Sequence, residues 1–439
     1  MGLLKVLVRP EKPISNRRFC LVFVFALSLP ATPGQASAQD RPAGVLTEPE
    51  AVRLGLSRPD VTDLFEGEIA VAQSDVMSAQ RWPNPEFSYT HEPSSSLPGD
   101  PDQEYLWLSQ RFDVSGRRGL RTAAAEHRVR AVTHDTELRR IELEAEIRQR
   151  FYEVLQRQMR VEAVKQWAGR MENITDIVRR QEAAGEVSAY DLRRLVRERS
   201  SAEARLDSEQ ANLAQAWERL QALLGRRDPH VPEQRVEGDL LPPTPLAPLE
   251  SQLAALAVRP DLRGLEQQMA ASELEQRAAA RWWIPEITLG AGLKQMAQGP
   301  FDDTVPLVSA AIALPFLDRQ QAERSRAAAQ AQLARSQRSL TLARATGEVR
   351  GLWQQANGLS NAARRFRKKT VQLSPELMGI AEAAYQGGQT GILELLDAYR
   401  SALDAELQAL ELELSARQAH IELDRLIGRT VVPMQGGAQ

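Results

Sequence analysis

The stretch RWPNPEFSY (residues 81–89) is written a second time, with changes, as RWWIPEITL (residues 281–289). In both places a helix-like run ends at Arg-Trp, and the prolines that follow prevent the helix from continuing. Three more pairs occur in the same order, 201 to 203 residues apart: RPD at 58 and 259, AGEVSAYDL at 184 and GGQTGILEL at 387, and LLGR at 223 and LIGR at 426. The chain is therefore a duplication of a unit of about 200 residues.

Each Arg-Trp-x-x-Pro-Glu segment introduces alternating apolar and polar residues, which predict a hairpin of two strands. We expect strands at about 85–91 and 104–113 in the first copy, and at about 285–294 and 305–315 in the second. The segments between them, EPSSSLPGDPD (92–102) and QMAQGPFDD (295–303), have the composition of loops. Strands of about ten residues have the length that a tilted transmembrane strand needs.

A long helix is predicted after each hairpin, over 117–182 and 316–386. In the first, apolar residues recur at spacings of three, four and seven, as in a coiled-coil seam. They are Ile147, Phe151, Val154, Val161, Val164, Ala168, Met171 and Val178. Ser374-Pro375 interrupts the second, where we expect a kink or a restart with Ser374 as the N-cap.

Helix lengths indicate how the two copies stack. At about 1.5 Å per residue, each long helix spans about 100 Å and each shorter predicted helix about 50 Å. The shorter helices cover 48–81, 188–224, 250–281 and 392–427. We expect 188–224 to be continued by 250–281, and 392–427 by the N-terminal helix. The four resulting columns would place all strands at one end and both glycine turns at the other.

The first 38 residues have the features of a secretory signal. Basic residues precede an apolar run from Phe19 to Leu29, and Ala36-Ser37-Ala38 supplies a site for cleavage after Ala38. A retained signal anchor is the alternative, although the run is too short to span a bilayer. The only cysteine, Cys20, lies in this segment, so the mature chain would carry no thiol or lipid attachment site.

The mature chain is expected to be mildly acidic. Segment 1–38 carries five basic residues and one acidic residue, so its removal changes the formal net charge from −3 to −7. Such a protein is a poor nucleic-acid binder. No later segment suits a transmembrane helix, so any membrane insertion must use strands. Four strands cannot enclose a lumen and strand edges cannot face lipid unpaired, so the chain must associate with copies of itself.

The predicted organisation has five parts: a signal peptide (1–38), a first repeat (39–225), a proline-rich linker (226–249), a second repeat (250–429) and a short tail (430–439). It resembles the TolC family of outer-membrane efflux proteins over essentially the whole mature chain. The resemblance rests on the duplicated Arg-Trp-x-x-Pro-Glu segments, the paired glycine turns and the Leu/Ile-Gly-Arg ends. NPEFSY followed by LSQRFDVSGRRGLR is most similar to the heavy-metal, cobalt-zinc-cadmium branch.

The resemblance implies a mainly α fold with a transmembrane β-barrel part. In the family, three chains form a twelve-stranded barrel in the outer membrane, which a helical tunnel continues through the periplasm. The homotrimer is a passive conduit rather than an enzyme, and it passes metal cations or small toxic compounds. A periplasmic adaptor (membrane fusion protein) and an inner-membrane pump of the RND type meet it at the glycine turns. Many relatives also carry an N-terminal lipid, which this sequence lacks.

The resemblance also assigns a periplasmic gate. Glu394 and Asp397 match the gate carboxylates, and their i, i+3 spacing places them on one helix face. In a trimer they would form two rings of three like charges, which attract cations. The alternative is that acidic residues in a helix's first turn only favour its dipole.

Asp191 and Arg194 are the first-copy counterparts of these two acids. Asp191 fits both the network that closes the entrance and a simple capping box with Ser188. Arg194 suits an ion pair with a neighbouring acid. Tyr385 matches a family tyrosine that hydrogen-bonds across the closed tip.

Two short segments are expected to form the turns themselves, because glycine permits the positive φ that helix reversals often need. They are Gly185, Glu186 and Val187 in the first copy and Gly388, Gln389 and Thr390 in the second. The resemblance makes them adaptor contacts as well; the alternative is that they are turns only.

The sequence indicates no cofactor or metal site. The histidines at 91, 127, 134, 230 and 420 form no ligand cluster, and no nucleophile–base set or phosphate loop appears. The basic run RRFRKK (364–369) fits a solvated face, or else a contact with the adaptor or cell wall. The competing function is a soluble periplasmic coiled-coil scaffold or adaptor without a pore, which would need no lipid-facing band on its strands.

Overall fold

The computed structural model describes residues 45–93, 102–225, 235–243, 245–298 and 301–432. These residues belong to one compact unit, Gly44–Gln439. The predicted signal peptide lies outside the described residues, as do most of the first hairpin loop and parts of the linker and tail. None of the described helices combines the length and the hydropathy needed to cross a lipid bilayer.

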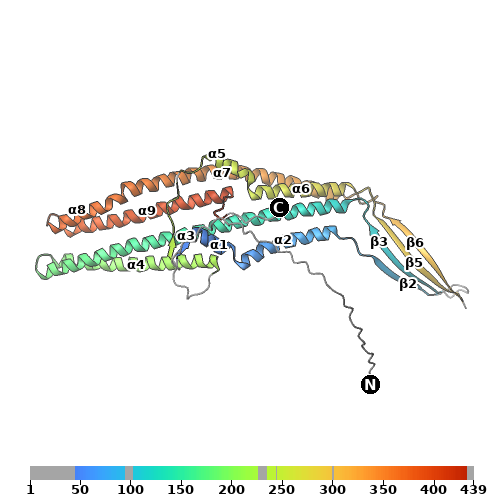
Figure 1. Ribbon diagram of the computed structural model, residues 1–439, viewed down its shortest axis with the longest axis horizontal. Coiled ribbons are helices and arrows are strands. Elements are labelled where there is room, and N and C mark those ends of the chain that lie inside the picture. Colours follow the sequence, from blue (N-terminus) through green and yellow to red (C-terminus); the bar gives the residue numbers. More distant parts are fainter. Residues whose placement is uncertain (1–44, 94–101, 226–234, 244, 299–300, 433–439) are drawn as a thin grey trace, which may run out of the picture. The chain divides into compact units, whose positions relative to one another are not determined.

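The strands of both copies join in one antiparallel sheet of order β2-β3-β5-β6 (Figure 1). Its strands are β2 (Glu86–Glu92), β3 (Asp102–Phe112), β5 (Ile287–Gln298) and β6 (Phe301–Ile312). The predicted loop 295–303 is wrong, because cross-strand pairing continues through its polar residues as far as Gln298 and Phe301. The fourth strand accordingly ends at Ile312 and not at 315.

The Arg-Trp motif anchors each hairpin to the long helix that follows it. In the first copy, the Arg118 guanidinium lies 3.7 Å from the centre of the Trp82 ring. In the second copy, Arg319, two residues before the second long helix begins, lies 5.7 Å from the centre of the Trp282 ring. Cation–π attraction of this kind contributes about 0.5–1 kcal/mol at exposed sites. The duplicated tryptophans therefore hold the same junction twice.

The first long helix, α3 (Arg117–Ala183), is one uninterrupted run of 67 residues, as predicted. Most of the predicted seam is buried, while Val161 and Ala168 are half-buried. The second long helix is not continuous: α7 (Gln321–Lys369) ends, a 3₁₀ turn (Val371–Leu373) follows, and α8 (Ser374–Gln386) begins. The restart at Pro375 is confirmed. Ser374 is not the N-cap, because its hydroxyl instead donates to the Thr370 carbonyl at 3.3 Å.

The shorter helices agree with prediction where no proline intervenes. These are α4 (Ala189–Leu224) and α9 (Ile392–Ile427). The other two are each divided: α1 (Glu48–Leu56) from α2 (Pro59–Gln80), and α5 (Leu249–Ala255) with a 3₁₀ turn (Leu256–Val258) from α6 (Pro260–Ala280). Pro59 and Pro260 each occupy the first position of a new helix, where the missing N–H costs nothing.

The shorter helices stack in the opposite pairing to the one predicted. Arg58 Nη1, before α2, donates to the last carbonyls of α4, at 2.8 Å to Ala222 and 3.0 Å to Leu223. Gly428, after α9, lies against Pro260 at the start of α6. Thus α2 continues α4, and α6 continues α9. The prediction assumed that consecutive helices stack, whereas the proline-rich linker carries the chain across to the other column.

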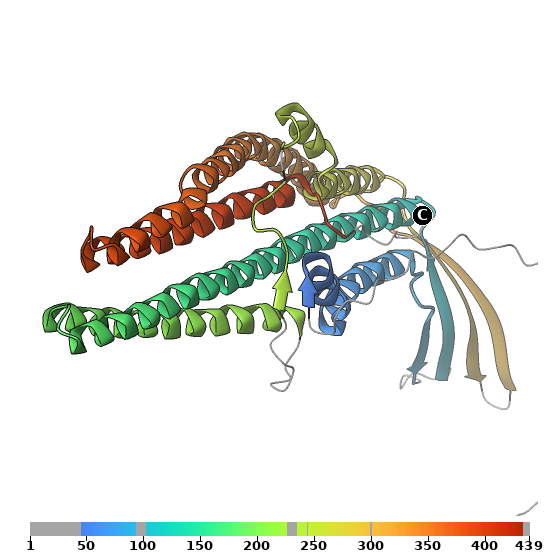
Figure 2. The ribbon, with the colours of Figure 1, turned by 60° about the vertical axis from the view of Figure 1, so that its left-hand side comes forward.

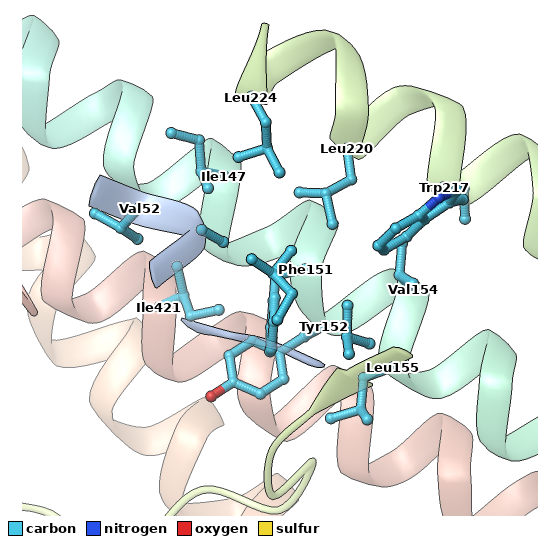
Figure 3. Close-up of a cluster of buried hydrophobic side chains, with 14 of the residues drawn as sticks. Val52, Ile147, Phe151, Tyr152, Val154, Leu155, Trp217, Leu220, Leu224 and Ile421 are labelled. Carbon is cyan, nitrogen blue, oxygen red and sulfur yellow. The ribbon is translucent and has the colours of Figure 1, made fainter. Parts of the chain in front are cut away.

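The columns meet in a buried core halfway along the bundle (Figure 3). Phe151 and Ile147 of α3 are fully buried there, against Val52 of α1, Leu220 of α4 and Ile421 of α9. A parallel pair of short strands, β1 (Val45–Thr47) and β4 (Arg235–Glu237), borders this core. Figures 1 and 2 show the four-stranded sheet at one end of this unit and the turns after α3 and α8 at the other, as predicted.

Candidate functional site

The two glycine turns have the same backbone geometry. After α3, the Glu186 N–H donates to the Gln181 carbonyl at 2.9 Å, and Gly185 has a φ of 79°. After α8, the Gln389 N–H donates to the Ala384 carbonyl at 2.9 Å, and Gly388 has a φ of 67°. This is the Schellman arrangement, in which glycine takes the left-handed position. The predicted turns are therefore confirmed as turns.

Both turns present their tips to solvent. Gly185, Glu186, Gly388 and Gln389 are exposed, whereas the last residue of each predicted segment, Val187 and Thr390, is half-buried. Val187 packs against the apolar cluster that joins the two helical hairpins. The tips thus offer backbone groups and two polar side chains on a firmly packed base.

Ser188 is the N-cap of α4, and Asp191 is its partner in the first turn. The Asp191 backbone N–H donates to the Ser188 hydroxyl at 3.1 Å, and that hydroxyl donates back to the Asp191 carboxylate at 2.6 Å. The same carboxylate lies near Tyr385 of α8. Burial, and then the charge of Asp191, raise the pKa of the Tyr385 hydroxyl, so it stays protonated and acts as a donor.

The helices form two helical hairpins, α3 with α4 and α8 with α9. Tyr385 links them through a residue that the sequence analysis did not identify. Its hydroxyl donates to the Gln181 side-chain carbonyl of α3 at 3.2 Å. The structure thus brings Tyr385, Gln181 and Asp191 together at the tip. No repeat signal marks Gln181, because its second-copy counterpart is an alanine.

Glu394 and Asp397 lie exposed on the first two turns of α9. Their carboxylates form no hydrogen bond or ion pair with any described residue, and Leu395 and Leu396 between them point into the core. The Glu394 carboxylate folds back toward Gly391, the N-cap of α9: a methyl group there would lie 3.1 Å from it. The geometry therefore suits a first-turn acid, and it also leaves both carboxylates free to face a neighbouring chain.

Arg194 is half-buried and, within the described part of one chain, forms no ion pair. The predicted pairing with a neighbouring acid is therefore not made inside the chain. Within one chain, no group of three or more His, Cys, Asp or Glu side chains gathers at a possible metal site among the described residues.

Farther from the tip, ion pairs between α4 and α9 hold the two helical hairpins together. The sequence analysis did not identify these pairs either. Arg400 of α9 forms an ion pair with Glu198 of α4, whose side chain is only 8% exposed. Below it, Arg205 of α4 lies 3.7 Å from Asp404 of α9. No repeat signal marks the first pair, because the counterpart of Glu198 is Ser401 and that of Arg400 is Arg197.

Comparisons with known proteins agree with this arrangement. A model of the "outer membrane efflux protein" family matches residues 58–226 and 253–429, which are the two copies. The cobalt-zinc-cadmium resistance protein CzcC of Cupriavidus metallidurans is 26% identical over 397 residues, which cover 88% of this chain and 91% of that protein.

Solved structures share the fold. A membrane protein of Pseudomonas aeruginosa gives a TM-score of 0.72 at 21% identity, over 87% of this chain and 92% of that one. The CmeC outer membrane channel of Campylobacter jejuni gives a TM-score of 0.70 at 15% identity, over 87% and 85% of the two chains. Because the family model covers both copies, the chain belongs to the outer membrane efflux protein family and acts as an efflux channel in the outer membrane.

Proposed function

We propose that three copies of the chain form one duct that receives solutes from an inner-membrane pump of the RND type and a periplasmic adaptor. The supporting observation is the separation of two unlike ends: a sheet with an apolar face at one, and glycine turns with unpaired carboxylates at the other. The duct itself is passive: it opens and closes, and the inner-membrane pump supplies the energy for transport.

The sheet supports a membrane role. One of its faces carries large apolar side chains that are exposed in the single chain: Phe87, Tyr89, Leu108, Leu289, Leu293, Val308 and Ile312. Its outer strands, β2 and β6, each pair on one side only. Unpaired edges are not tolerated in lipid, so three such sheets would join edge to edge into twelve strands.

Helix faces support the same assembly. Leu64 and Val71 lie seven residues apart on α2, and Leu373, Leu377 and Ile380 follow one stripe from the 3₁₀ turn into α8. All five side chains are about half exposed or more in the single chain. Apolar stripes of this kind mark contacts with another chain. We assign them to the contacts between neighbouring copies.

At the tip, we propose that Glu394 and Asp397 of three copies form the acidic rings of the gate. Both carboxylates are exposed and unpaired within the described residues, so neighbouring copies can bring them together. Arg194, Asp191 and Tyr385 would complete the closed state, with Arg194 pairing to an acid of the next copy. Clustered carboxylates select cations and bind divalent cations at a constriction.

Conductance through planar lipid bilayers tests this proposal. The double variant Glu394→Gln/Asp397→Asn keeps the side-chain shapes but removes the charges, so we expect larger currents and weaker block by divalent cations. Glu376→Gln is the matched control, because Glu376 is an exposed first-turn acid of α8 outside the proposed rings.

Two results would count against it. Purified chain that gives no conductance contradicts the duct. Channels whose currents and divalent block are the same in the double variant and in the Glu376 control contradict the gate alone.

The exposed tips of the two turns are proposed as the adaptor contacts. Glu186 and Gln389 carry side chains there that no described residue engages. Because the tips stand on a packed base, an adaptor could bind them without disturbing the helices.

For the cargo we propose divalent metal cations, because the relative that aligns over most of the chain is a cobalt-zinc-cadmium resistance protein and the proposed rings favour cations. Small toxic organic compounds are the second candidate. A strain without the chain should lose resistance to zinc, cobalt or cadmium salts and regain it on complementation. Loss of resistance to organic compounds alone would favour the second candidate.

A further inference from the structure

The two faces of the four-stranded sheet differ. Residues that share a face follow from the strand register, in which Leu108 pairs with Ala291 and Trp107 with Gly292. The Leu108 face carries the exposed apolar band described above. The Trp107 face carries many small and polar residues, namely Tyr105, Ser109, Thr288, Gly290, Gly292, Lys294 and Ser309, together with the apolar residues Met296, Val305, Leu307 and Ala311. In a duct of three copies, the first face would meet lipid and the second would line the lumen.

Trp107 does not project from this second face. A methyl group at Gly290 would lie 2.7 Å from two atoms of the Trp107 indole, Cζ2 and Nε1. A methyl group at Gly292 would collide with the same indole and with the Leu106 carbonyl oxygen. The indole therefore lies flat across the backbone of β5, in the space that two missing side chains leave. Gly290 is buried although it sits in a single exposed sheet.

The ring beside it reinforces this arrangement. Lys294, on the same face of β5, places its ammonium group 5.2 Å from the centre of the Tyr105 ring. Both aromatic side chains of β3 on this face thus contact β5: Trp107 lies over Gly290 and Gly292, and Tyr105 lies beside Lys294. Glycine weakens a strand by roughly 0.5–1 kcal/mol. Two glycines at alternate positions under one indole are explained by the room they make for it.

We infer that Gly290 and Gly292 form a recess that keeps the Trp107 indole against the wall of the lumen, so that this trio sets the bore of the membrane part of the duct. The inference rests on the proposed duct of three copies. Each copy supplies one indole at the same height. If the recess is filled, three indoles move inward together.

Gly290→Ala tests the recess, because the three atoms nearest to a methyl group at that position all belong to the Trp107 side chain, whereas one at Gly292 also meets backbone. We expect a loss of single-channel conductance in Gly290→Ala and its recovery in the double variant Gly290→Ala/Trp107→Ala. Ser309→Ala is the matched control, since Ser309 pairs with Gly290 across β5 and β6 on the same face. Its conductance should equal that of the parent chain.

A second experiment establishes which face meets water. Cys20 is the only cysteine of the sequence and lies in the segment expected to be removed, so single cysteines can be placed at will. Trp107→Cys should react with a membrane-impermeant thiol reagent and lose conductance on modification. Leu108→Cys, one residue along on the opposite face, should not react.

The outcomes separate this inference from the duct itself. Channels that form normally, with unchanged conductance in Gly290→Ala or with reaction at Leu108→Cys in place of Trp107→Cys, overturn the recess and leave the duct standing. If Gly290→Ala does not assemble and Trp107→Ala fails to rescue it, the recess is also overturned, because something other than the indole then fills that space. Absence of any channel in the parent chain overturns both.

Discussion

His420 is an unusual residue for the middle of a helical bundle. The residue is half-buried, and its ring Nδ1 is buried with no hydrogen-bond partner among the described residues. Burial lowers the pKa of His420, and Arg417, Arg148 and Arg429 lower it further, while Asp424 acts in the opposite direction. The folded chain therefore holds this ring neutral.

Acid should destabilise the chain through this ring. The unfolded chain takes up a proton on His420 below about pH 6.5, whereas the folded chain resists it, so the free energy of unfolding falls as the pH drops through that range. In His420→Leu, the loss of melting temperature between about pH 7.5 and 5.5 should be smaller than in the parent chain. His127→Gln serves as the control. An identical pH dependence in all three chains would contradict this account.

At this scale, the sequence predicted residues whose role is local. Ser188 caps α4 with Asp191 as its partner, and this Ser-x-x-Asp pattern needs only the adjacent turn. The exposure of Glu394 and Asp397 follows from helix periodicity. Gln181 and the Glu198–Arg400 pair could not be predicted, since their partners are set by how one hairpin packs on the other. Contacts of that kind need the packed helices themselves.

Among the elements, the junctions at which α2 continues α4 and α6 continues α9 both contain an Arg-Pro-Asp motif. Proline begins the new helix, Asp60 holds the Arg58 guanidinium, and Arg58 Nη1 reaches two carbonyls at the end of α4. In the second copy, Arg259 pairs with Asp261 in the same way, but its Nη1 is buried without a partner among the described residues. The two motifs are alike in sequence and unlike in contact.

This difference gives a matched pair of variants. Arg58→Lys should lower the free energy of unfolding by about 1–3 kcal/mol more than Arg259→Lys, because only Arg58 loses charged hydrogen bonds to helix carbonyls. Thermal unfolding followed by circular dichroism measures both. Equal losses would show that the carbonyl bonds contribute nothing beyond the local Arg–Asp pairing.

Element types were predictable and their junctions were not. Both hairpins and α3 were expected near their observed positions, because alternation and a coiled-coil seam are strong periodic signals. The breaks at Pro59 and Pro260 were overlooked, although proline at the first position of a helix marks them. Which shorter helix continues which could not be predicted from the sequence, because it depends on the path of the linker between the two copies.

For the whole molecule, the asymmetry of the sheet is the feature that decides membrane insertion. Val308, in β6, is 87% exposed on the apolar face, while Ser309 follows it on the opposite face. We expect Val308→Lys to block stable insertion, because a lysine facing the bilayer midplane costs about 2–4 kcal/mol. In the proposed assembly of three copies, that cost would arise three times. Ser309→Lys, whose side chain would face the lumen, should still insert.

Membrane fractionation and the heat-modifiable mobility of the folded oligomer on gels measure the outcome. If Ser309→Lys blocks insertion as completely as Val308→Lys does, then the position along β6, and not the face of the sheet, controls insertion. Normal insertion of Val308→Lys would mean that this face does not meet lipid.

The open edges of β2 and β6 carry a consequence for the life of the chain after export. A sheet that is complete only when neighbours supply its edges has a stability linked to concentration by mass action. At low concentration the helices of a single chain would stay folded, while both edges of its sheet remain unpaired. Any other strand could then pair with those edges. The rate of synthesis and export should therefore govern how much of the protein assembles and how much aggregates.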